Sequence, residues 1–490
     1  MSTHEVILPS ISDADLPEEG GASVEKVILQ GSLAAPSASI GSREELSLLD
    51  EATPAATTDE KNSEEDLELE DLSEEEHPIG KVILDFLHRV MDIESCAVLF
   101  ISSAIENYNS TCDDLLKQLE ACDVESVGEG AEKIVNLKDV TKLLRKVERH
   151  SKSLPIDTLE RSLFVNIFSC YDKFIGELVF SIYREAPHLY KSLNRDMPLS
   201  EILNYASIND LKEMVLDKEV ETLRRKSYVE QFGEFENRFG LPLTKFDSWP
   251  VFVEMGQRRN LFTHCDGIVS KQYLQICKDN NCKLDKDIQP GDQLKIGGKY
   301  FFKACTVATE VATMLGQTLW RKIIPDDLEK ADISLNRLIF DFLQDESWQN
   351  AISLSKFALG LPRVSKDIYK RMYAINYAIA LKAIGEISAA RSVLQKFDWS
   401  ATIYDFRLAY EVLVGDLDVA ADLMKRLGVD GEFINELSYH DWPLFRDFRG
   451  TEQFFDSYES VFGYKYSSKL AEIVEEKIMS VDEHMHQAES

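Results

Sequence analysis

The sequence has no apolar run approaching the roughly 18 continuous residues of a membrane-spanning helix, although 44% of its 490 residues are hydrophobic. Its first twenty residues lack a basic region followed by an apolar run, so we expect neither a secretory signal nor an Arg-rich transit peptide. No Walker loop, G-x-G-x-x-G, G-x-S-x-G or H-E-x-x-H motif is present, which leaves nucleotide hydrolysis, dinucleotide binding, serine hydrolysis and zinc proteolysis without support. We therefore expect a cytoplasmic protein that uses no cofactor and no membrane.

Cysteine is also scarce. Most of the eight cysteines fall within apolar patterns of helical spacing, where a reduced thiol packs as a small hydrophobic side chain. Only Cys277 and Cys282 lie close together, and no second pair of Cys or His accompanies them at the spacing that zinc requires. We expect two free thiols beside a turn, with a metal site as the alternative.

The net charge of −32 is distributed unevenly along the chain. Residues 1–76 hold 21 acidic side chains against three basic ones, a net charge of −18. This stretch is rich in Ser, Ala, Pro and Glu, so it cannot bury enough apolar surface to offset the entropy of ordering, and we predict a disordered acidic tail. An acidic chain repels nucleic acid at long range, which argues against a general nucleic-acid coat protein but permits a small basic cleft.

Beyond the tail, apolar residues recur at helical spacing and predict an all-α protein. The widest apolar stripe runs from Arg161 to Glu185, and Pro187 should end that helix. Further helices are expected at 199–204, 208–239, 251–264 and 300–322. Breaks between these patterns divide the chain into the acidic tail (1–76), a helical lead-in (77–150), a helical bundle (151–325), helical repeats (326–465) and a C-terminal tail helix (466–490).

The helical repeats are recognised from an internal similarity with a period of 30 residues. Gly385 aligns with Gly415, and the same shift aligns three apolar pairs, Ile387 with Leu417, Ala390 with Ala420 and Leu394 with Met424. Trp348 and Ala351 repeat part of the spacing upstream. A Gly in the turn and an Ala at the crossing point suit two closely packed antiparallel helices, and stacked hairpins of this kind form a solenoid. The stretch resembles tetratricopeptide repeats with a degenerate signature, and the alternative is an ordinary helical bundle.

The segment VEMGQRRNLFTHCDGIV carries the most informative motif. Arg259, Asn260 and His264 stand as an arginine, a polar residue, three variable residues and a histidine near the end of a helix. This arrangement resembles the HEPN (higher eukaryotes and prokaryotes nucleotide-binding) ribonucleases, over about residues 155–323. The resemblance extends to the bacterial defence branch of the family. It implies a HEPN helical bundle that dimerises so that two copies of the motif line one cleft, with RNA as substrate.

The chemistry of these residue types agrees with such a role. RNA can be cleaved by its own 2′-hydroxyl if a base removes that proton, an acid protonates the leaving 5′-oxygen and positive charge stabilises the phosphorane. His264 can act as acid or base near neutrality, and Arg259 can donate two N–H groups to phosphate. Residues five apart on a helix differ in direction by about 140°, so one chain alone makes a poor site. Pairing would also bring two copies of Arg258, the expected RNA-binding residue, into one groove.

A fourth candidate comes from the segment FSCYDKFIGE, which resembles the part of the family where an acidic side chain points toward the motif. Asp172 takes that position and could orient His264 or Arg259, or could simply be solvated on the flank of its helix.

The sequence thus leads to two hypotheses. The first is a metal-independent RNA endonuclease, a toxin or an antiviral (abortive infection) effector whose repeats sense a trigger or hold a partner protein. The alternative is a non-catalytic HEPN scaffold that dimerises and binds protein.

Overall fold

The computed structural model describes residues 76–121, 132–193, 196–285 and 287–474. The acidic tail expected at 1–76 lies almost entirely outside this part of the chain, as does the end of the expected C-terminal helix, of which 466–474 are helical. Within the described ranges every regular element is a helix, apart from a single β-bridge between Ile268 and Gln293, so the prediction of an all-α protein is confirmed. No helix in these ranges combines the length and the apolar character needed to cross a lipid bilayer.

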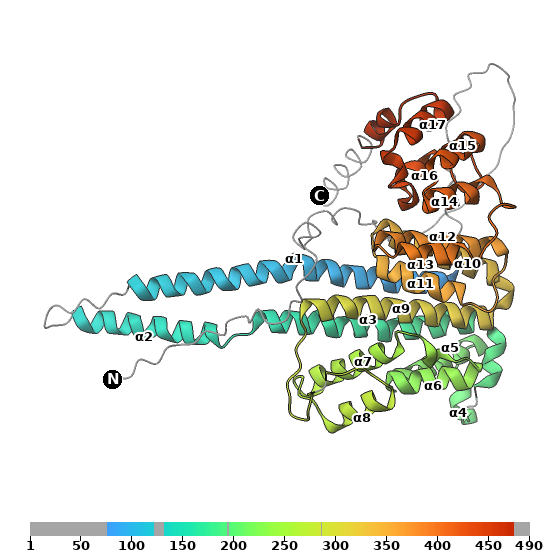
Figure 1. Cartoon of the computed structure of the whole chain (residues 1–490). Coiled ribbons are helices and arrows are strands. Elements are labelled where there is room, and N and C mark those ends of the chain that lie inside the picture. Colours follow the sequence, from blue (N-terminus) through green and yellow to red (C-terminus); the bar gives the residue numbers. More distant parts are fainter. Residues whose placement is uncertain (1–75, 122–131, 194–195, 286, 475–490) are drawn as a thin grey trace, which may run out of the picture. The chain divides into compact units, whose positions relative to one another are not determined.

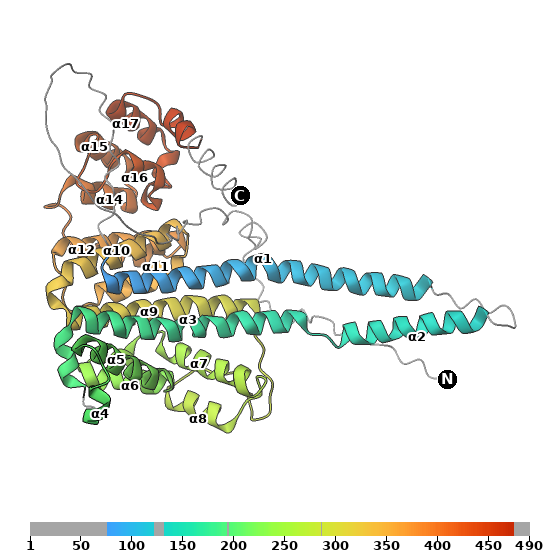
Figure 2. The same cartoon turned by 180° about the vertical axis from the view of Figure 1, so that it is seen from behind.

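Three long helices form the centre of the fold. They are α1 (Pro78–Ala121), α3 (Pro155–Glu185) and α9 (Gly298–Ile323), which pack against one another and run side by side in Figure 1. The reverse view in Figure 2 shows the same layer, with α2 (Glu132–Ser151) running back along the far half of α1. The helix α9 matches the expected helix at 300–322 to within two residues at each end.

The apolar stripe of α3 is fully buried, as the sequence predicted. Eight of its side chains have relative exposures of 0% or 1%: Phe164, Ile167, Phe168, Tyr171, Phe174, Ile175, Leu178 and Ile182. Pro155 occupies the first turn, where no backbone N–H partner is needed, and α3 ends two residues before Pro187. This helix is therefore the rigid support on which the surrounding helices are placed.

One face of α3 is covered by a group of shorter helices. In chain order these are the 3₁₀ helix Pro187–Ser192, α4 (Leu199–Ile202), α5 (Ile208–Arg224), α6 (Tyr228–Phe239), the 3₁₀ helix Leu243–Lys245, α7 (Trp249–His264) and α8 (Lys271–Asp279). Contacts join α3 to both α5 and α7, and α7 to both α8 and α9. The helix that carries the motif, α7, thus lies between α3, α8 and α9.

The single helical pattern expected over 208–239 is in fact two helices. The chain breaks after Arg224 and restarts at Tyr228, because Ser227 forms a capping box in which its hydroxyl accepts from the backbone N–H of Glu230 while the Glu230 carboxylate accepts from the backbone N–H of Ser227. The sequence Ser-x-x-Glu is a recognised start signal, so this break could have been read from the sequence.

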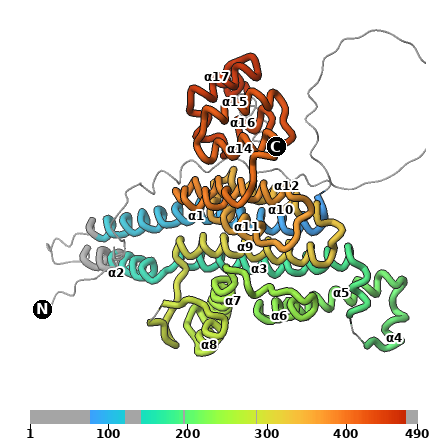
Figure 3. The backbone as a smooth tube through the Cα atoms, turned by 45° about the vertical axis from the view of Figure 1, so that its right-hand side comes forward, coloured from blue at the N-terminus to red at the C-terminus, as the bar shows by residue number. Residues whose placement is uncertain are grey.

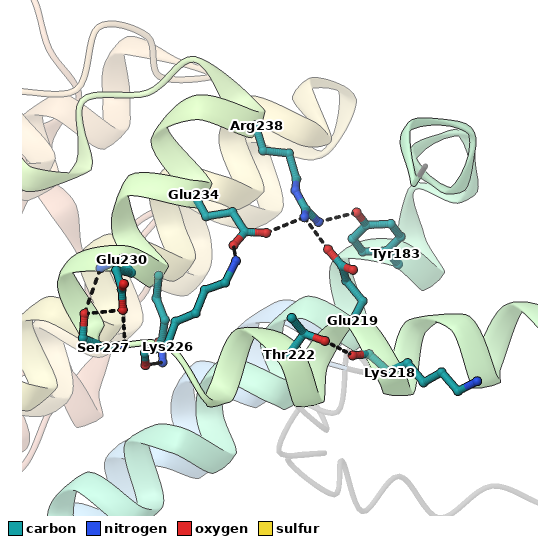
Figure 4. Close-up of polar contacts among 10 residues, drawn as sticks. Tyr183, Lys218, Glu219, Thr222, Lys226, Ser227, Glu230, Glu234 and Arg238 are labelled. Carbon is teal, nitrogen blue, oxygen red and sulfur yellow. Dashed lines mark hydrogen bonds and ion pairs between the residues drawn. The ribbon is translucent and has the colours of Figure 1, made fainter. Parts of the chain in front are cut away.

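A charged network fastens α5 and α6 to α3 (Figure 4). Arg238 donates from Nη1 to the hydroxyl of Tyr183 over 2.9 Å and from Nη2 to the carboxylates of Glu219 and Glu234. Lys226 also pairs with Glu234. Because Arg238 is half-buried and holds partners on three helices, the network fixes the angle of the α5–α6 pair.

The C-terminal part of the structure consists of helical hairpins. They comprise the 3₁₀ helix Pro325–Asp327, α10 (Leu328–Gln344), α11 (Trp348–Leu359), α12 (Asp367–Ala383), α13 (Ile387–Leu394), α14 (Tyr404–Val414), α15 (Leu417–Leu427), α16 (Glu436–Asp441), the 3₁₀ helices Pro443–Phe445 and Phe448–Gly450, and α17 (Glu452–Phe462). Figure 3 traces the chain through them in this order.

Three of these hairpins turn in the same way. Gly385, between α12 and α13, and Gly415, between α14 and α15, have φ values of 85° and 90°. Glu346 occupies the matching position between α10 and α11 with φ 57°. The alanines aligned in the sequence, Ala390 and Ala420, are both buried in the second helix of their hairpin. The internal repeat therefore corresponds to a repeated helical hairpin, while its resemblance to tetratricopeptide repeats stays a prediction.

One apolar core runs through all these groups. It includes Ile83 of α1, Phe174 of α3 and Trp320 of α9, and it continues into Leu335 of α10. The expected boundaries at 150 and 325 therefore do not divide the core into separate parts, since α1 packs on α3 and both α10 and α11 pack on α9.

Candidate functional site

The helix α7 holds all the motif residues and spans Trp249–His264, two residues longer at its start than the expected 251–264. Its first half is buried through Trp249, Phe252 and Met255. Its second half approaches the surface, and its last backbone turn closes with the N–H of Cys265 donating to the carbonyl of Leu261 over 2.8 Å. The motif therefore lies where a firmly packed helix reaches solvent.

Arg259 is bound to Asp172 across the α3–α7 contact. Its Nη2 lies 2.9 Å from Oδ2 of Asp172, while Oδ1 of the same carboxylate accepts from the hydroxyl of Tyr228 over 3.0 Å. Arg224 of α5 adds a bond of 2.9 Å to the backbone carbonyl of Asp172. This contact joins two of the four expected catalytic residues. The sequence left open whether Asp172 would orient Arg259 or His264. In the structure Asp172 contacts Arg259 and not His264.

The Arg259–Asp172 pair is partly buried, with side-chain exposures of 23% and 25%. Burial raises the pKa of Asp172, and the positive charge of Arg259 acts in the opposite direction. The Nε of Arg259 is buried and has no hydrogen-bond partner in the described part of the chain. A buried N–H without an acceptor is costly, so this atom is an unsatisfied donor within the fold.

The position of Tyr228 depends on Gly256 of α7, which has no side chain. A Cβ at Gly256 would lie 2.6 Å from Cδ2 of Tyr228, so only glycine permits the ring to lie this close to the helix. The ring also packs against Phe168 and Phe252. Sequence analysis missed Tyr228, whose only signal was its position directly after the capping Ser227.

Asn260 and His264 have different surroundings. The Oδ1 of Asn260 accepts from Nη1 of Arg259 over 3.1 Å, so Asn260 helps to hold the guanidinium. His264 is exposed in the last turn of α7 and makes no hydrogen bond or ion pair with the described residues. Within one chain, therefore, the structure joins Asp172, Arg259 and Asn260 but leaves His264 separate from them.

The loop after His264 is nonetheless firmly held. Asp266 and Gly267 both have positive φ values, 50° and 78°, which reverse the chain. Arg161 of α3 pairs with the Asp266 carboxylate and lies over the ring of Phe262. The backbone then pairs with the later loop, as the N–H of Leu294 donates to the carbonyl of Gly267 over 2.9 Å. The end of α7 is therefore anchored on both sides.

Arg258, the expected RNA-binding residue, lies in a second polar cluster. Its Nε donates to the buried carboxylate of Glu254 over 2.8 Å, and its guanidinium lies 4.0 Å from the ring centre of Tyr300. Glu254 also accepts from the hydroxyls of Tyr273 and Tyr300, each over 2.7 Å. The side chain of Arg258 is only 13% exposed, so its charge interacts mainly with Glu254 and Tyr300 inside the fold. The tyrosine partners could not be found from sequence spacing.

Comparisons with known proteins found no relative of this chain. No protein-family model, no curated protein and no solved structure matches it.

Proposed function

We propose that this protein is a metal-independent RNA endonuclease in which Arg259 stabilises the phosphorane and His264 transfers protons. The observation that carries this proposal is the state of Arg259. Its guanidinium is oriented by Asp172 and Asn260 and stays partly exposed. A phosphate oxygen that meets the exposed part of the guanidinium would receive a charge-assisted hydrogen bond.

The reaction needs no group beyond the RNA and the side chains. His264 as base takes the proton of the 2′-hydroxyl, whose oxygen attacks the adjacent phosphorus. A protonated imidazole then gives its proton to the 5′-oxygen as the P–O5′ bond breaks. The products are a 2′,3′-cyclic phosphate and a 5′-hydroxyl.

Two protomers are part of the proposal. Arg259 and His264 differ in direction by about 140° around α7, so the exposed imidazole of one chain serves the ordered arginine of another more readily than its own. A homodimer formed through the exposed end of α7 would place two motifs in one cleft. The helical repeats are then available to hold a partner protein or to sense a trigger, as in a defence effector or toxin.

The test compares cleavage of a labelled RNA by the wild-type chain, His264→Ala and Arg259→Ala. His188→Ala is the matched control, since His188 is an exposed histidine in the 3₁₀ helix after α3. We expect loss of cleavage in the first two variants only, resistance to chelators, and no cutting of DNA of the same sequence. Equal cleavage by wild type and His264→Ala, or no cleavage by the wild type, would remove the proposal.

A non-catalytic scaffold is the second candidate, and one observation favours it. Both arginines of the motif already have a carboxylate partner, Arg258 with Glu254 and Arg259 with Asp172. In that case the motif would serve to hold α3, α7 and α9 together. The scaffold predicts that the wild-type chain cleaves no RNA, and that Arg259→Ala lowers the melting temperature while the chain still dimerises.

A further inference from the structure

A second, smaller apolar core lies beneath the end of α7. Its buried members are Leu261, Val269, Tyr273, Cys277 and Leu294. Cys282 packs against this core from the side and is partly exposed. Both cysteines of the close pair seen in the sequence therefore belong to the packing that supports the motif helix.

The two thiols are brought together by a reversal of the chain. Cys277 lies in the last turn of α8, and five residues of continued helix would separate it from Cys282 by about 7.5 Å along the axis. Instead Asn281 adopts φ 55°, and the backbone N–H of Cys282 donates to the carbonyl of Cys277 over 2.8 Å. The two thiols lie close enough to shift each other's pKa.

The members of the pair differ in chemistry. The interaction with Cys282, together with burial, raises the pKa of the Cys277 thiol. The same interaction lowers the pKa of the Cys282 thiol, so the pair holds its proton more tightly on Cys277. Cys282 is thus both the readier thiolate and the more exposed sulfur, which are the two properties of a reactive cysteine.

We propose that Cys277 and Cys282 are a redox-modification site that peroxides oxidise to a reversible disulfide. The Cys282 thiolate attacks one peroxide oxygen, so that an S–O bond forms, the O–O bond breaks, and the leaving hydroxide takes up a proton to become water. The Cys277 sulfur then attacks the Cys282 sulfenic acid. An S–S bond forms, the S–O bond breaks, and the departing hydroxide combines with the Cys277 proton as a second water. Each peroxide therefore oxidises two thiols.

The experiment treats the full-length wild-type chain with hydrogen peroxide, alkylates the remaining thiols and maps the peptides by mass spectrometry. We expect a 277–282 disulfide, a mass lower by two hydrogen atoms, and full reversal by dithiothreitol. The exposed Cys265 of the same chain is the internal standard. Because the thiolate is the attacking species, Cys282 should be half-oxidised at a peroxide concentration at least roughly tenfold lower than Cys265.

Two variants test the order of events. Cys277→Ser should stop the reaction at a sulfenic acid on Cys282, which dimedone traps, while Cys282→Ser should leave Cys277 unmodified because it is buried. Cys265→Ser is the matched control and should form the disulfide normally. A wild-type map in which Cys282 stays reduced while Cys265 oxidises would overturn the proposal. So would a disulfide that joins Cys282 to any cysteine other than Cys277. Neither result depends on the folding of a variant.

Discussion

The guanidinium of Arg259 lies 2.9 Å from the carboxylate of Asp172, although 87 residues separate them in the chain. The same carboxylate accepts a hydrogen bond from Tyr228, so one acidic side chain connects α3 with α6 and α7. Asp172 is therefore a positioning residue in the proposed reaction. It holds the arginine that meets phosphate, and it does not itself touch the substrate.

Replacing Asp172 by Asn should weaken RNA cleavage without abolishing it. The Asp172→Asn variant would keep the size of the side chain but would lose the negative charge that orients Arg259. A hydrogen bond to a charged group contributes about 1.5–3 kcal/mol, which corresponds to a rate lower by roughly tenfold to hundredfold. The measurement is kcat on a labelled RNA. Asp217→Asn, at an exposed site on α5, is the matched control, and an equal loss in both variants would show that the effect is not specific to the pair.

The close approach of Tyr228 to α7 gives a prediction that is independent of catalysis. Gly256→Ala would place a methyl group 2.6 Å from the Tyr228 ring, which must then move. We expect the free energy of unfolding to fall by about 1–3 kcal/mol, the usual cost of overpacking. Urea denaturation measures the change.

Gly233→Ala provides the control for that substitution. Gly233 lies within α6, and nothing would contact its new methyl group within 4 Å. Because alanine favours a helix over glycine by about 1 kcal/mol, this variant should be more stable than the wild type. If both alanine variants shifted the midpoint in the same direction, the contact between Gly256 and Tyr228 would not be as close as described.

Helix periodicity was sufficient to predict α3 and α9, because each buries a continuous apolar stripe whose spacing is visible in a short window. The turn glycines Gly385 and Gly415 also identified two helical hairpins, since a left-handed turn strongly selects glycine. The third hairpin was less visible because Glu346 fills the same turn position. Local sequence patterns thus predicted the helices and hairpin turns. They failed at the turn where glutamate stands in place of the usual glycine.

The candidate site was only partly predictable for a different reason. Asp172 and Arg259 were identified through a family motif, but their contact depends on how α3 and α7 pack. The hydrogen bonds of Glu254 to Tyr273 and Tyr300 join positions 19 and 46 residues apart and follow no period. Such contacts are fixed by tertiary packing, so neither the burial of Arg258 nor the part played by Tyr228 could be read from the sequence.

Replacing Glu346, the non-glycine residue at the first hairpin turn, by glycine should raise the free energy of unfolding. Glu346 has φ 57°, a conformation that costs an L-residue about 1–2 kcal/mol. Glu346→Gly removes this strain and loses only an exposed ion pair with Arg446, which contributes little. We expect a net gain of about 1 kcal/mol by urea denaturation. Gly385→Ala, at the equivalent turn, should lose a similar amount, and a loss in both variants would contradict the equivalence of the turns.

The last prediction concerns the pH dependence of stability at the α1–α9 contact. Burial raises the pKa of Glu94 from 4.5 to about 7, and the thiol of Cys305 donates a hydrogen bond that acts weakly against this shift. A raised carboxyl pKa means that the folded protein holds the proton more tightly than the unfolded chain. The contribution of Glu94 to stability is therefore highest below about pH 4.5, falls between pH 4.5 and 7, and stays low above pH 7.

Glu94→Gln keeps the shape and an oxygen acceptor for Cys305 but removes the titration. A shift of this size corresponds to roughly 3 kcal/mol, and because Glu94 is only partly buried we expect a gain of roughly 2 kcal/mol at about pH 8. Near pH 4.5 the variant should match the wild type. Glu106→Gln removes the same charge from an exposed position of α1 and should change little at either pH. Urea denaturation at several pH values gives the comparison. A constant difference between Glu94→Gln and wild type across that range would mean that the Glu94 carboxyl is not the group that titrates.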